Sequence, residues 1–286
     1  MKLGKIIIFV LIVAAFAVGV YYSQEVRNQI SNLQKVDVGL MLTQVEKQLL
    51  TPPPLNIGGK EQQVTLLKSQ IIAQTNFQRM LNESAPLQEL KENTVLDAVA
   101  AAKAQDMFNK QYFEHVSPSG VGPGDLAQTF GYDYIVEGEN LILGNFSSEK
   151  EVVDAWMASP GHRANILNTR FTEIGVAIIK GTYKGQSVWI GVQEFGLPLS
   201  VCTQPDANLR QQIDLGKTTL DVVFSEIDTL KNQIDNADRS SAVYEQMINN
   251  YNELVNQYNT MADNLKKIIA EYNSKVNIFN NCVAGK

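Results

Sequence analysis

The chain contains only two histidines in 286 residues, and both lie in short segments that are typical of functional sites. His115 precedes Val-Ser-Pro-Ser-Gly, and His162 follows Ser-Pro-Gly. Glu139 lies between them in the run Gly-Glu-Asn. Imidazole transfers protons near neutral pH and also binds borderline metals. The three side chains are therefore the candidate site, and together they are enough to hold Zn²⁺ or another divalent cation with one open position.

The same three side chains are also enough to bind a polar ligand without any chemistry. A third possibility is that His115 and Glu139 form a polar pair that ties loops to the core of the protein. The surrounding Gly and Pro residues allow close turns, and the chain offers no other histidine. The sequence favours a functional role, but it does not separate metal binding from ligand binding.

Composition excludes one large class of partners. The formal net charge is -6, and the chain has no long Lys/Arg block. Nucleic-acid phosphates require clustered cations on the protein surface. We therefore expect no nucleic-acid partner.

The N-terminus predicts a connection to the membrane. Lys2 and Lys5 precede an uncharged, largely apolar run from Ile6 to Tyr22, which spans roughly 26 Å as a helix. The lysines place the N-terminus in the cytoplasm and the rest of the chain outside it. We interpret residues 1–22 as a transmembrane anchor, with a cleaved signal peptide, and hence a secreted protein, as the alternative.

The two cysteines, Cys202 and Cys282, agree with export. An isolated pair in an exported chain favours a disulfide over two free thiols. Neither has another cysteine or a histidine nearby in sequence, so a zinc site at this pair is the weaker interpretation.

Three further regions follow the anchor. Residues 23–63 predict a stalk and a linker, since Pro52 to Pro54 stop any helix and Gly58-Gly59 loosens the chain. Residues 64–198 have the composition of a packed α+β domain. Residues 199–286 change to a heptad pattern.

Within 64–198 the patterns predict both helices and strands. Residues 66–81 and 94–109 favour helices, and Ser147 or Ser148 can cap a third. Residues 173–180 and 186–195 are rich in β-branched and aromatic side chains, with a turn at 181–185 between them. We expect these two strands to be antiparallel neighbours.

The C-terminal region predicts an antiparallel helical hairpin, because a polar run at 235–241 separates two sets of heptads. Folding back brings Cys202 and Cys282 to the same end. The expected seam consists of Leu209, Ile213, Leu220, Val223, Ile227, Leu230 and Ile234, and of Tyr244, Met247, Tyr251, Leu254, Tyr258, Met261, Leu265, Ile268, Tyr272 and Phe279.

Five short segments in the middle region resemble the motifs of the CAP superfamily, which holds the cysteine-rich secretory and pathogenesis-related proteins, and in particular its bacterial SCP-domain branch. Five motifs in order make the resemblance specific, although it leaves out the anchor, the stalk and the hairpin. The segments are Thr75-Asn76-Phe77-Gln78-Arg79, Phe113-Glu114-His115-Val116-Ser117-Pro118, Gly138-Glu139-Asn140-Leu141, Trp156 with Ser159-Pro160-Gly161-His162-Arg163, and Gln193-Glu194-Phe195-Gly196.

The resemblance implies an α-β-α sandwich with a cleft that holds two histidines and two acidic residues and binds a divalent metal in some members. His115, Glu139 and His162 match three of the four positions. The fourth departs, because this chain has Ser159 where eukaryotic members place Glu three residues after the tryptophan. The family pattern gives Glu194 a structural role.

Ser159 has a structural role of its own, because Ser before Pro160 is typical of a helix start with the hydroxyl as N-cap. His162 then falls in the first helical turn. There the positive end of the helix dipole favours neutral imidazole.

The leading functional hypothesis is a membrane-tethered, extracytoplasmic CAP-domain protein that binds a lipid, glycan or protein ligand of the envelope in this cleft. One alternative is a metal-dependent hydrolase of peptide or cell-wall material, with metal on His115 and His162 and with Glu139 as third ligand or base. Another is an interaction protein that acts through the hairpin. Whether the protein is an enzyme stays open. The expected ligand-binding residues are His115, Ser117, Glu139, Asn140, Ser159 and His162.

Overall fold

The computed structural model describes residues 55–56 and 64–285, and these fall into two compact units that divide after Cys202. The predicted anchor at 1–22 and almost all of the stalk and linker at 23–63 lie outside the described residues. Within the described residues, no helix is long and apolar enough to cross a membrane.

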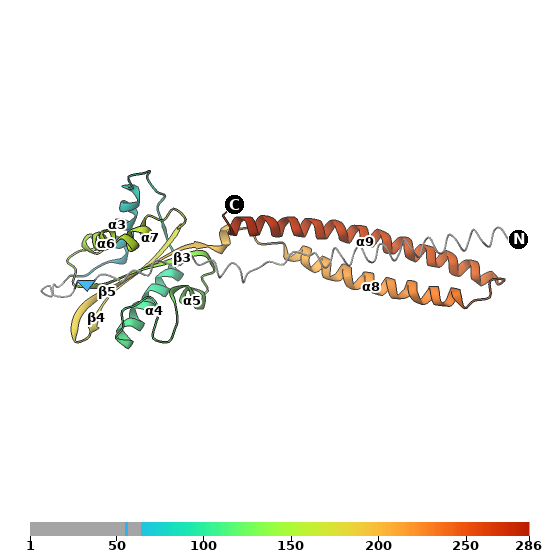
Figure 1. The fold of residues 1–286 in the computed structure, drawn as a ribbon, viewed down its shortest axis with the longest axis horizontal. Coiled ribbons are helices and arrows are strands. Elements are labelled where there is room, and N and C mark those ends of the chain that lie inside the picture. Colours follow the sequence, from blue (N-terminus) through green and yellow to red (C-terminus); the bar gives the residue numbers. More distant parts are fainter. Residues whose placement is uncertain (1–54, 57–63, 286) are drawn as a thin grey trace. The chain divides into compact units, whose positions relative to one another are not determined.

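The first unit is built on a five-stranded sheet with the strand order β1-β3-β5-β4-β2 (Figure 1). The three long strands, β3, β5 and β4, pair antiparallel, whereas the two-residue edge strands pair parallel to their neighbours. The strands are β1 (Leu55–Asn56), β2 (Lys91–Glu92), β3 (Tyr134–Gly144), β4 (Glu173–Tyr183) and β5 (Gln186–Pro198).

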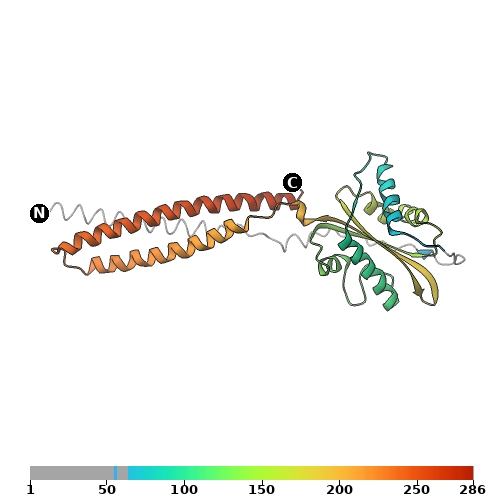
Figure 2. The ribbon, with the colours of Figure 1, turned by 180° about the vertical axis from the view of Figure 1, so that it is seen from behind.

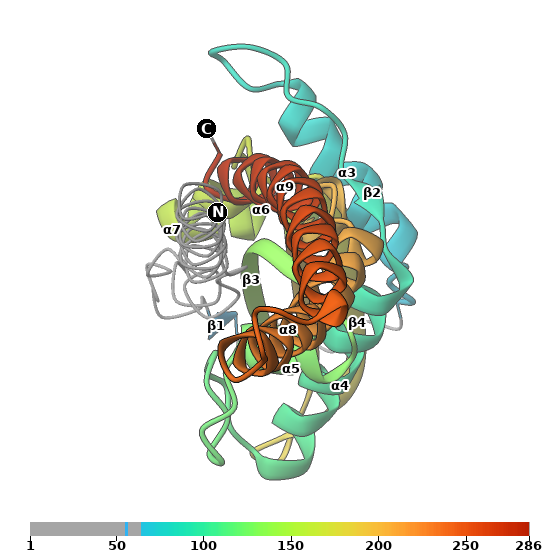
Figure 3. The ribbon, with the colours of Figure 1, turned by 90° about the vertical axis from the view of Figure 1, so that its right-hand side faces the viewer.

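Helices cover both faces of this sheet, as Figures 1 and 3 show. One face carries α3 (Lys68–Met80), α6 (Glu149–Ala158) and α7 (Pro160–Ile166). The other carries α4 (Thr94–Lys110) and α5 (Pro123–Thr129). This arrangement is the α-β-α sandwich that the sequence predicted.

The elements that the sequence predicted begin and end close to their observed bounds. The helix expected at 66–81 is α3, and the one expected at 94–109 is α4. Ser148 is the N-cap of α6, and its hydroxyl accepts a hydrogen bond from the backbone N–H of Glu151. The strands β4 and β5 form the expected antiparallel hairpin, with positive φ at Lys184 and Gly185 in its turn.

The central strand β3 is the element that sequence reasoning missed. All eleven of its residues are buried, including Glu137 and Glu139. A buried strand normally consists of apolar residues, so two glutamates two positions apart interrupt the pattern. Because β3 pairs with β5 along ten positions, it carries the site glutamates into the centre of the domain.

Close packing of α4 against β4 sets the position of the loop that carries His115. At Gly175 a Cβ atom would lie 2.1 Å from the carbonyl carbon of Leu96, so only glycine allows this approach. Ala100, Ala104 and Met107 continue the same helix face into the core between α4 and the sheet. The loop that follows α4 is thereby held over β3.

The second unit contains a hairpin of two long helices, α8 (Ala207–Asp235) and α9 (Ala242–Val283), as the heptads predicted (Figure 2). Both helices start with a side-chain cap. Asp206 accepts from two backbone N–H groups of α8, and Ser241 accepts from one of α9. Five α8 residues of the expected seam are buried: Leu209, Ile213, Leu220, Ile227 and Ile234.

The predicted α9 seam residues are buried or packed against the hairpin core, but the most buried set differs from them at one of its two positions. Every seventh residue from Tyr251 to Phe279 is buried as expected, but the second seam position lies one residue later than predicted. Val255 and Ile269 are buried, whereas Leu254 and Ile268 are only partly so. Ala262 is fully buried and looks too weakly apolar in sequence to mark a seam. The complete buried set is Tyr251, Val255, Tyr258, Ala262, Leu265, Ile269, Tyr272, Val276 and Phe279.

The predicted disulfide is confirmed, because Cys202 and Cys282 are bonded to each other. Cys202 directly precedes the hairpin segment, and Cys282 lies in the last turn of α9. The disulfide therefore links the two ends of the segment that forms the hairpin.

Candidate functional site

Three glutamates lie together on one face of the sheet. Glu139 on β3 is directly opposite Glu194 on β5. Glu137 is two residues before Glu139 on the same strand, so its side chain points to the same face. All three carboxyls are buried.

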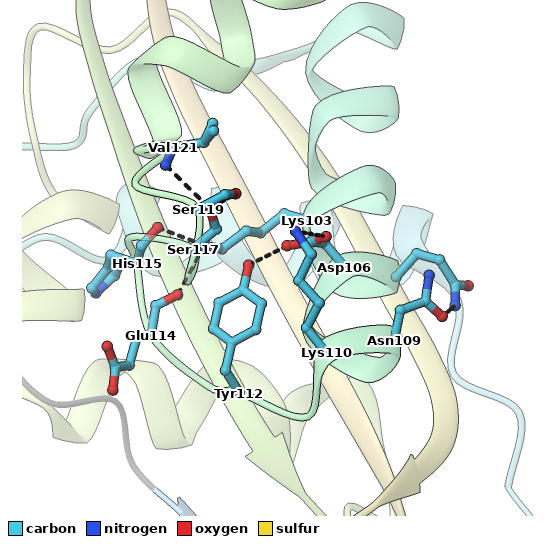
Figure 4. Close-up of polar contacts among 11 residues, drawn as sticks. Lys103, Asp106, Asn109, Lys110, Tyr112, Glu114, His115, Ser117, Ser119 and Val121 are labelled. Carbon is cyan, nitrogen blue, oxygen red and sulfur yellow. Dashed lines mark hydrogen bonds and ion pairs between the residues drawn. The ribbon is translucent and has the colours of Figure 1, made fainter.

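His115 contacts this cluster from the loop after α4. Its Nδ1 lies 2.7 Å from Oε1 of Glu139, within hydrogen-bond distance. The sequence placed these residues 24 positions apart, and the structure brings them into direct contact. A carboxylate at Nδ1 fixes the ring orientation and leaves Nε2 as the nitrogen for a ligand. Figure 4 shows the ring of His115 turned away from Tyr112 and Lys103.

His162 is the third residue of α7, and its side chain is only 2% exposed. Neither of its ring nitrogens has a hydrogen-bond partner among the described residues. Burial, together with the charge of nearby His115, lowers the pKa of His162 to about 4. The imidazole is therefore neutral at pH 7, as expected, and burial is the largest cause.

The carboxyl cluster retains protons at neutral pH. Burial, together with the charge of Glu139, raises the pKa of Glu137 to about 8. Burial and both neighbouring carboxyls raise the pKa of Glu194 well above its ordinary value. Neither carboxyl oxygen of Glu194 has a hydrogen-bond partner among the described residues, so the protonated form is favoured there. The cluster thus carries less negative charge than three glutamates would suggest.

Asn140 belongs to a different network, on the opposite face of β3. Its amide donates to the backbone carbonyl of His162 and to Oε1 of Gln193, each over 3.1 Å. Its own oxygen accepts from Asn165 over 3.0 Å. The side chain is fully buried, so these bonds hold α7, and with it His162, against the sheet.

The two serines of the predicted site are placed differently. The hydroxyl of Ser117 lies 2.9 Å from that of Ser119 and accepts from the backbone N–H of Val121 (Figure 4). Ser159 starts α7 and precedes Pro160 as predicted. The expected capping bond from its hydroxyl was wrong: no such bond forms within the described part of the chain. Ser159 also ends α6, and its extended backbone serves both helices.

The three expected metal ligands do not form a closed ligand set. Glu139 is engaged with Nδ1 of His115. Within residues 55–56 and 64–285, no three His, Cys, Asp or Glu side chains are grouped to hold a metal ion. The arrangement instead offers two imidazoles, one oriented by a carboxylate and one without a partner in the described chain.

Sequence reasoning missed Glu137 as a site residue and gave Glu194 only a structural role. A weak signal for both existed, since each is a charged residue inside an apolar run. Such a residue is rarely buried without a partner. The register of β3 against β5, which the sequence did not reveal, is what brings them to Glu139.

Comparison with known proteins shows which family this domain is similar to. Residues 73–195 match the family model described as "CAP: Cysteine-rich secretory protein family". The chain contains a CAP domain. The match covers the first four motif segments in full and the fifth up to Phe195, and the site residues His115, Glu139 and His162 lie within it.

Two curated Bacillus subtilis proteins are similar to this CAP domain. The uncharacterized protein YkwD is 41% identical over 126 residues, which cover 44% of this chain and 46% of that protein. The uncharacterized membrane protein YlbC is 31% identical over 119 residues, which cover 42% of this chain and 33% of that protein. The chain thus matches less than half the length of either relative.

Solved structures are similar over the same region. One is an extracellular protein from Bacillus anthracis that contains an SCP domain, with 30% identity, a TM-score of 0.38, and coverage of 45% of this chain and 39% of that chain. Another is an outer surface protein from Borrelia burgdorferi, with 23% identity, a TM-score of 0.39, and coverage of 46% and 91%.

Proposed function

We propose that this chain is a membrane-anchored protein whose CAP domain lies outside the cytoplasm and binds a hydroxyl-rich component of the cell envelope between His115 and His162. The observation that carries the proposal is the imidazole of His162. It is buried, and neither ring nitrogen has a hydrogen-bond partner in the described chain. A buried polar group without a partner is costly, and a ligand would supply the missing bonds.

The protonation of the site indicates the ligand class. A neutral imidazole has one donor nitrogen and one acceptor nitrogen, which matches a hydroxyl group. The low pKa of His162 keeps its ring in this form at neutral pH. The neighbouring carboxyls make the site unfavourable for anions. Sugar hydroxyls fit these requirements, so a glycan is the proposed ligand.

Attachment to the membrane is the second part of the proposal. The uncharged run from Ile6 to Tyr22, preceded by Lys2 and Lys5, supports an anchor that leaves the domain outside. We expect the protein in the membrane fraction of cells. We also expect protease added outside the cells to degrade it. Protection from that protease would contradict the proposed location.

The binding test uses the full chain in a mild detergent. Soluble fragments of peptidoglycan glycan strands are titrated into the wild type and into His115→Ala/His162→Ala, with calorimetry as the measurement. We expect saturable one-site binding to the wild type and at least about tenfold weaker binding to the double variant, because two ligand hydrogen bonds are lost. Glu83→Ala, at an exposed position on the loop after α3, is the control and should bind as the wild type does.

A parallel titration with zinc chloride separates the alternative. One-site zinc binding that disappears in the double variant, without glycan binding, would support the metal-dependent hydrolase instead. If the double variant binds the glycan as well as the wild type while keeping its near-UV circular dichroism, the proposal is wrong. Absence of glycan binding by the wild type would also refute it.

A further inference from the structure

A cavity lies beside the loop that carries His115, between α4 and the start of α5. Its volume is about 220 Å³, enough for a small organic molecule. None of His115, Glu139 and His162 lines it. The cavity is therefore separate from the proposed glycan site, and the inference below does not depend on that site.

Lys103 provides a buried cation at this cavity. Its side chain is only 3% exposed. The ammonium donates to the backbone carbonyls of Glu114 and His115, over 2.8 and 2.5 Å, and lies 5.2 Å from the ring centre of Tyr112. Figure 4 shows the side chain reaching from α4 to this loop. An ammonium has three N–H groups, so two bonds to carbonyls leave one for a ligand.

No carboxylate pairs directly with Lys103 in the part of the chain that the structure describes. The nearest acidic residue lining the cavity, Asp106, is already satisfied. One of its oxygens lies 2.8 Å from the ammonium of Lys110, and the other accepts the hydroxyl of Tyr112 over 2.7 Å. Asp106 also interacts electrostatically with Lys103. The cavity is nevertheless lined by two cations, Lys103 and Lys110, and by one carboxylate, so it has a net positive charge. A buried charge without a counter-ion is unfavourable, and an anionic ligand would supply one.

The other lining residues indicate the chemical groups that such a ligand would carry. The hydroxyls of Ser117 and Ser119 also line the cavity and are hydrogen-bonded to each other over 2.9 Å, so the pair has one proton left to donate to an anion. Apolar atoms come from Ala102, Val121 and Leu126. The lining therefore combines a cationic, hydroxyl-rich part with an apolar part.

We propose that this cavity binds a carboxylate attached to a short apolar group, with Lys103 as counter-ion and with the hydrogen-bonded hydroxyl pair of Ser117 and Ser119 as a further donor. The ligand then shares the ammonium that fixes the loop carrying His115. The carboxyl terminus of a peptide belongs to this chemical class.

The test compares two probes of equal size with the full chain in a mild detergent. N-acetylvaline carries a carboxylate, and N-acetylvalinamide replaces it with a neutral amide. Saturation-transfer NMR measures both affinities. We expect N-acetylvaline to bind with a Kd of about 1 mM and the amide to bind at least about tenfold more weakly, because only the carboxylate neutralises the buried charge.

Three variants assign the binding to this cavity. Lys103→Met keeps the chain length, removes the charge and should abolish binding of N-acetylvaline. Ser119→Ala changes an exposed loop residue and should weaken binding about fivefold, since one hydroxyl bond is lost. Lys150→Met removes an exposed cation from α6, on the other face of the sheet, and should leave binding unchanged.

If Lys103→Met does not fold, two measurements still test whether the cavity binds a carboxylate. They are the comparison of the two probes and the affinity of Ser119→Ala. Equal affinity for the acid and the amide would overturn the proposal. So would unchanged N-acetylvaline binding by Ser119→Ala, or the absence of N-acetylvaline binding by the wild type at 20-fold the expected Kd, about 20 mM.

Discussion

The buried carboxyl cluster should make the CAP domain less stable as pH rises through neutrality. Replacement of Glu137 by Gln tests this, because glutamine has nearly the same shape but does not titrate. The pKa of Glu137 is raised from an ordinary value of 4.5 to about 8, chiefly by burial. In the unfolded chain the same carboxyl loses this burial.

The direction in which the free energy of unfolding changes with pH follows from the number of protons that the folded and unfolded states bind. Below pH 4.5 Glu137 is protonated in both states, so it adds no pH dependence. Between pH 4.5 and 8 the folded domain keeps a proton that the unfolded chain has released, so the free energy of unfolding falls as pH rises. One group contributes roughly 3 kcal/mol between pH 5.5 and 7.5, since each pH unit corresponds to about 1.4 kcal/mol. Glu194 acts in the same direction, because its pKa is also raised. His162 acts in the opposite direction below pH 6.5, because its pKa is lowered to about 4 and only the unfolded chain binds a proton there, so the net fall is steepest between pH 6.5 and 7.5.

The assay is urea unfolding of the full chain at pH 5.5, 6.5 and 7.5, followed by tryptophan fluorescence. The only tryptophans, Trp156 and Trp189, are both buried in the CAP domain, so the signal reports on this domain and not on the hairpin. The wild type should lose stability over this range. Glu137→Gln should lose roughly 3 kcal/mol less, and Glu89→Gln, at an exposed position, should follow the wild type.

Two results would refute this reasoning. One is a wild-type domain that becomes more stable as pH rises from 5.5 to 7.5. The other is a Glu137→Gln variant that folds and keeps the full pH dependence of the wild type. Either result would mean that the folded cluster does not hold an extra proton.

Three further predictions concern stability. Gly175→Ala should destabilise the CAP domain by roughly 3 kcal/mol, because its Cβ would lie 2.1 Å from the backbone of Leu96. Urea unfolding followed by fluorescence measures this loss of stability. A loss below about 1 kcal/mol would contradict the close packing of α4 against β4. Cys202→Ser/Cys282→Ser should destabilise the hairpin by about 4 kcal/mol through the lost loop constraint, seen as a lower midpoint of helical circular dichroism, and an unchanged midpoint would count against it. Arg79→Met removes three bonds from a buried guanidinium to backbone carbonyls and should cost roughly 3 kcal/mol in the same fluorescence assay, whereas stability equal to the wild type would show that these bonds are dispensable.

Several features of this protein could be predicted from its sequence alone. The helices α3 and α4, the β4–β5 hairpin and the C-terminal helical hairpin follow from periodicity and turn residues, which are local properties of the chain. The disulfide followed from the cysteine pair and the polar break at 235–241. The motifs identified the CAP domain. They also made His115, Glu139 and His162 the candidate site residues, because two histidines in turn-rich segments stand out in a chain that has no others.

Other features depend on contacts between residues that are distant in sequence. Strand β3 was missed because its glutamates interrupt the apolar pattern that marks a buried strand. On α9 the seam includes Ala262, because close helix packing favours a small side chain that local hydrophobicity does not reveal.

Only the tertiary structure decided how the site is arranged. The register of β3 against β5 places Glu194 opposite Glu139, and mutual burial then shifts the protonation of the carboxyls. The same fold places Lys103 beside the loop of His115 with no carboxylate partner in the described chain. Charge, burial and pKa depend on neighbours in space, so a sequence can name the reactive side chains but does not determine their protonation or their partners.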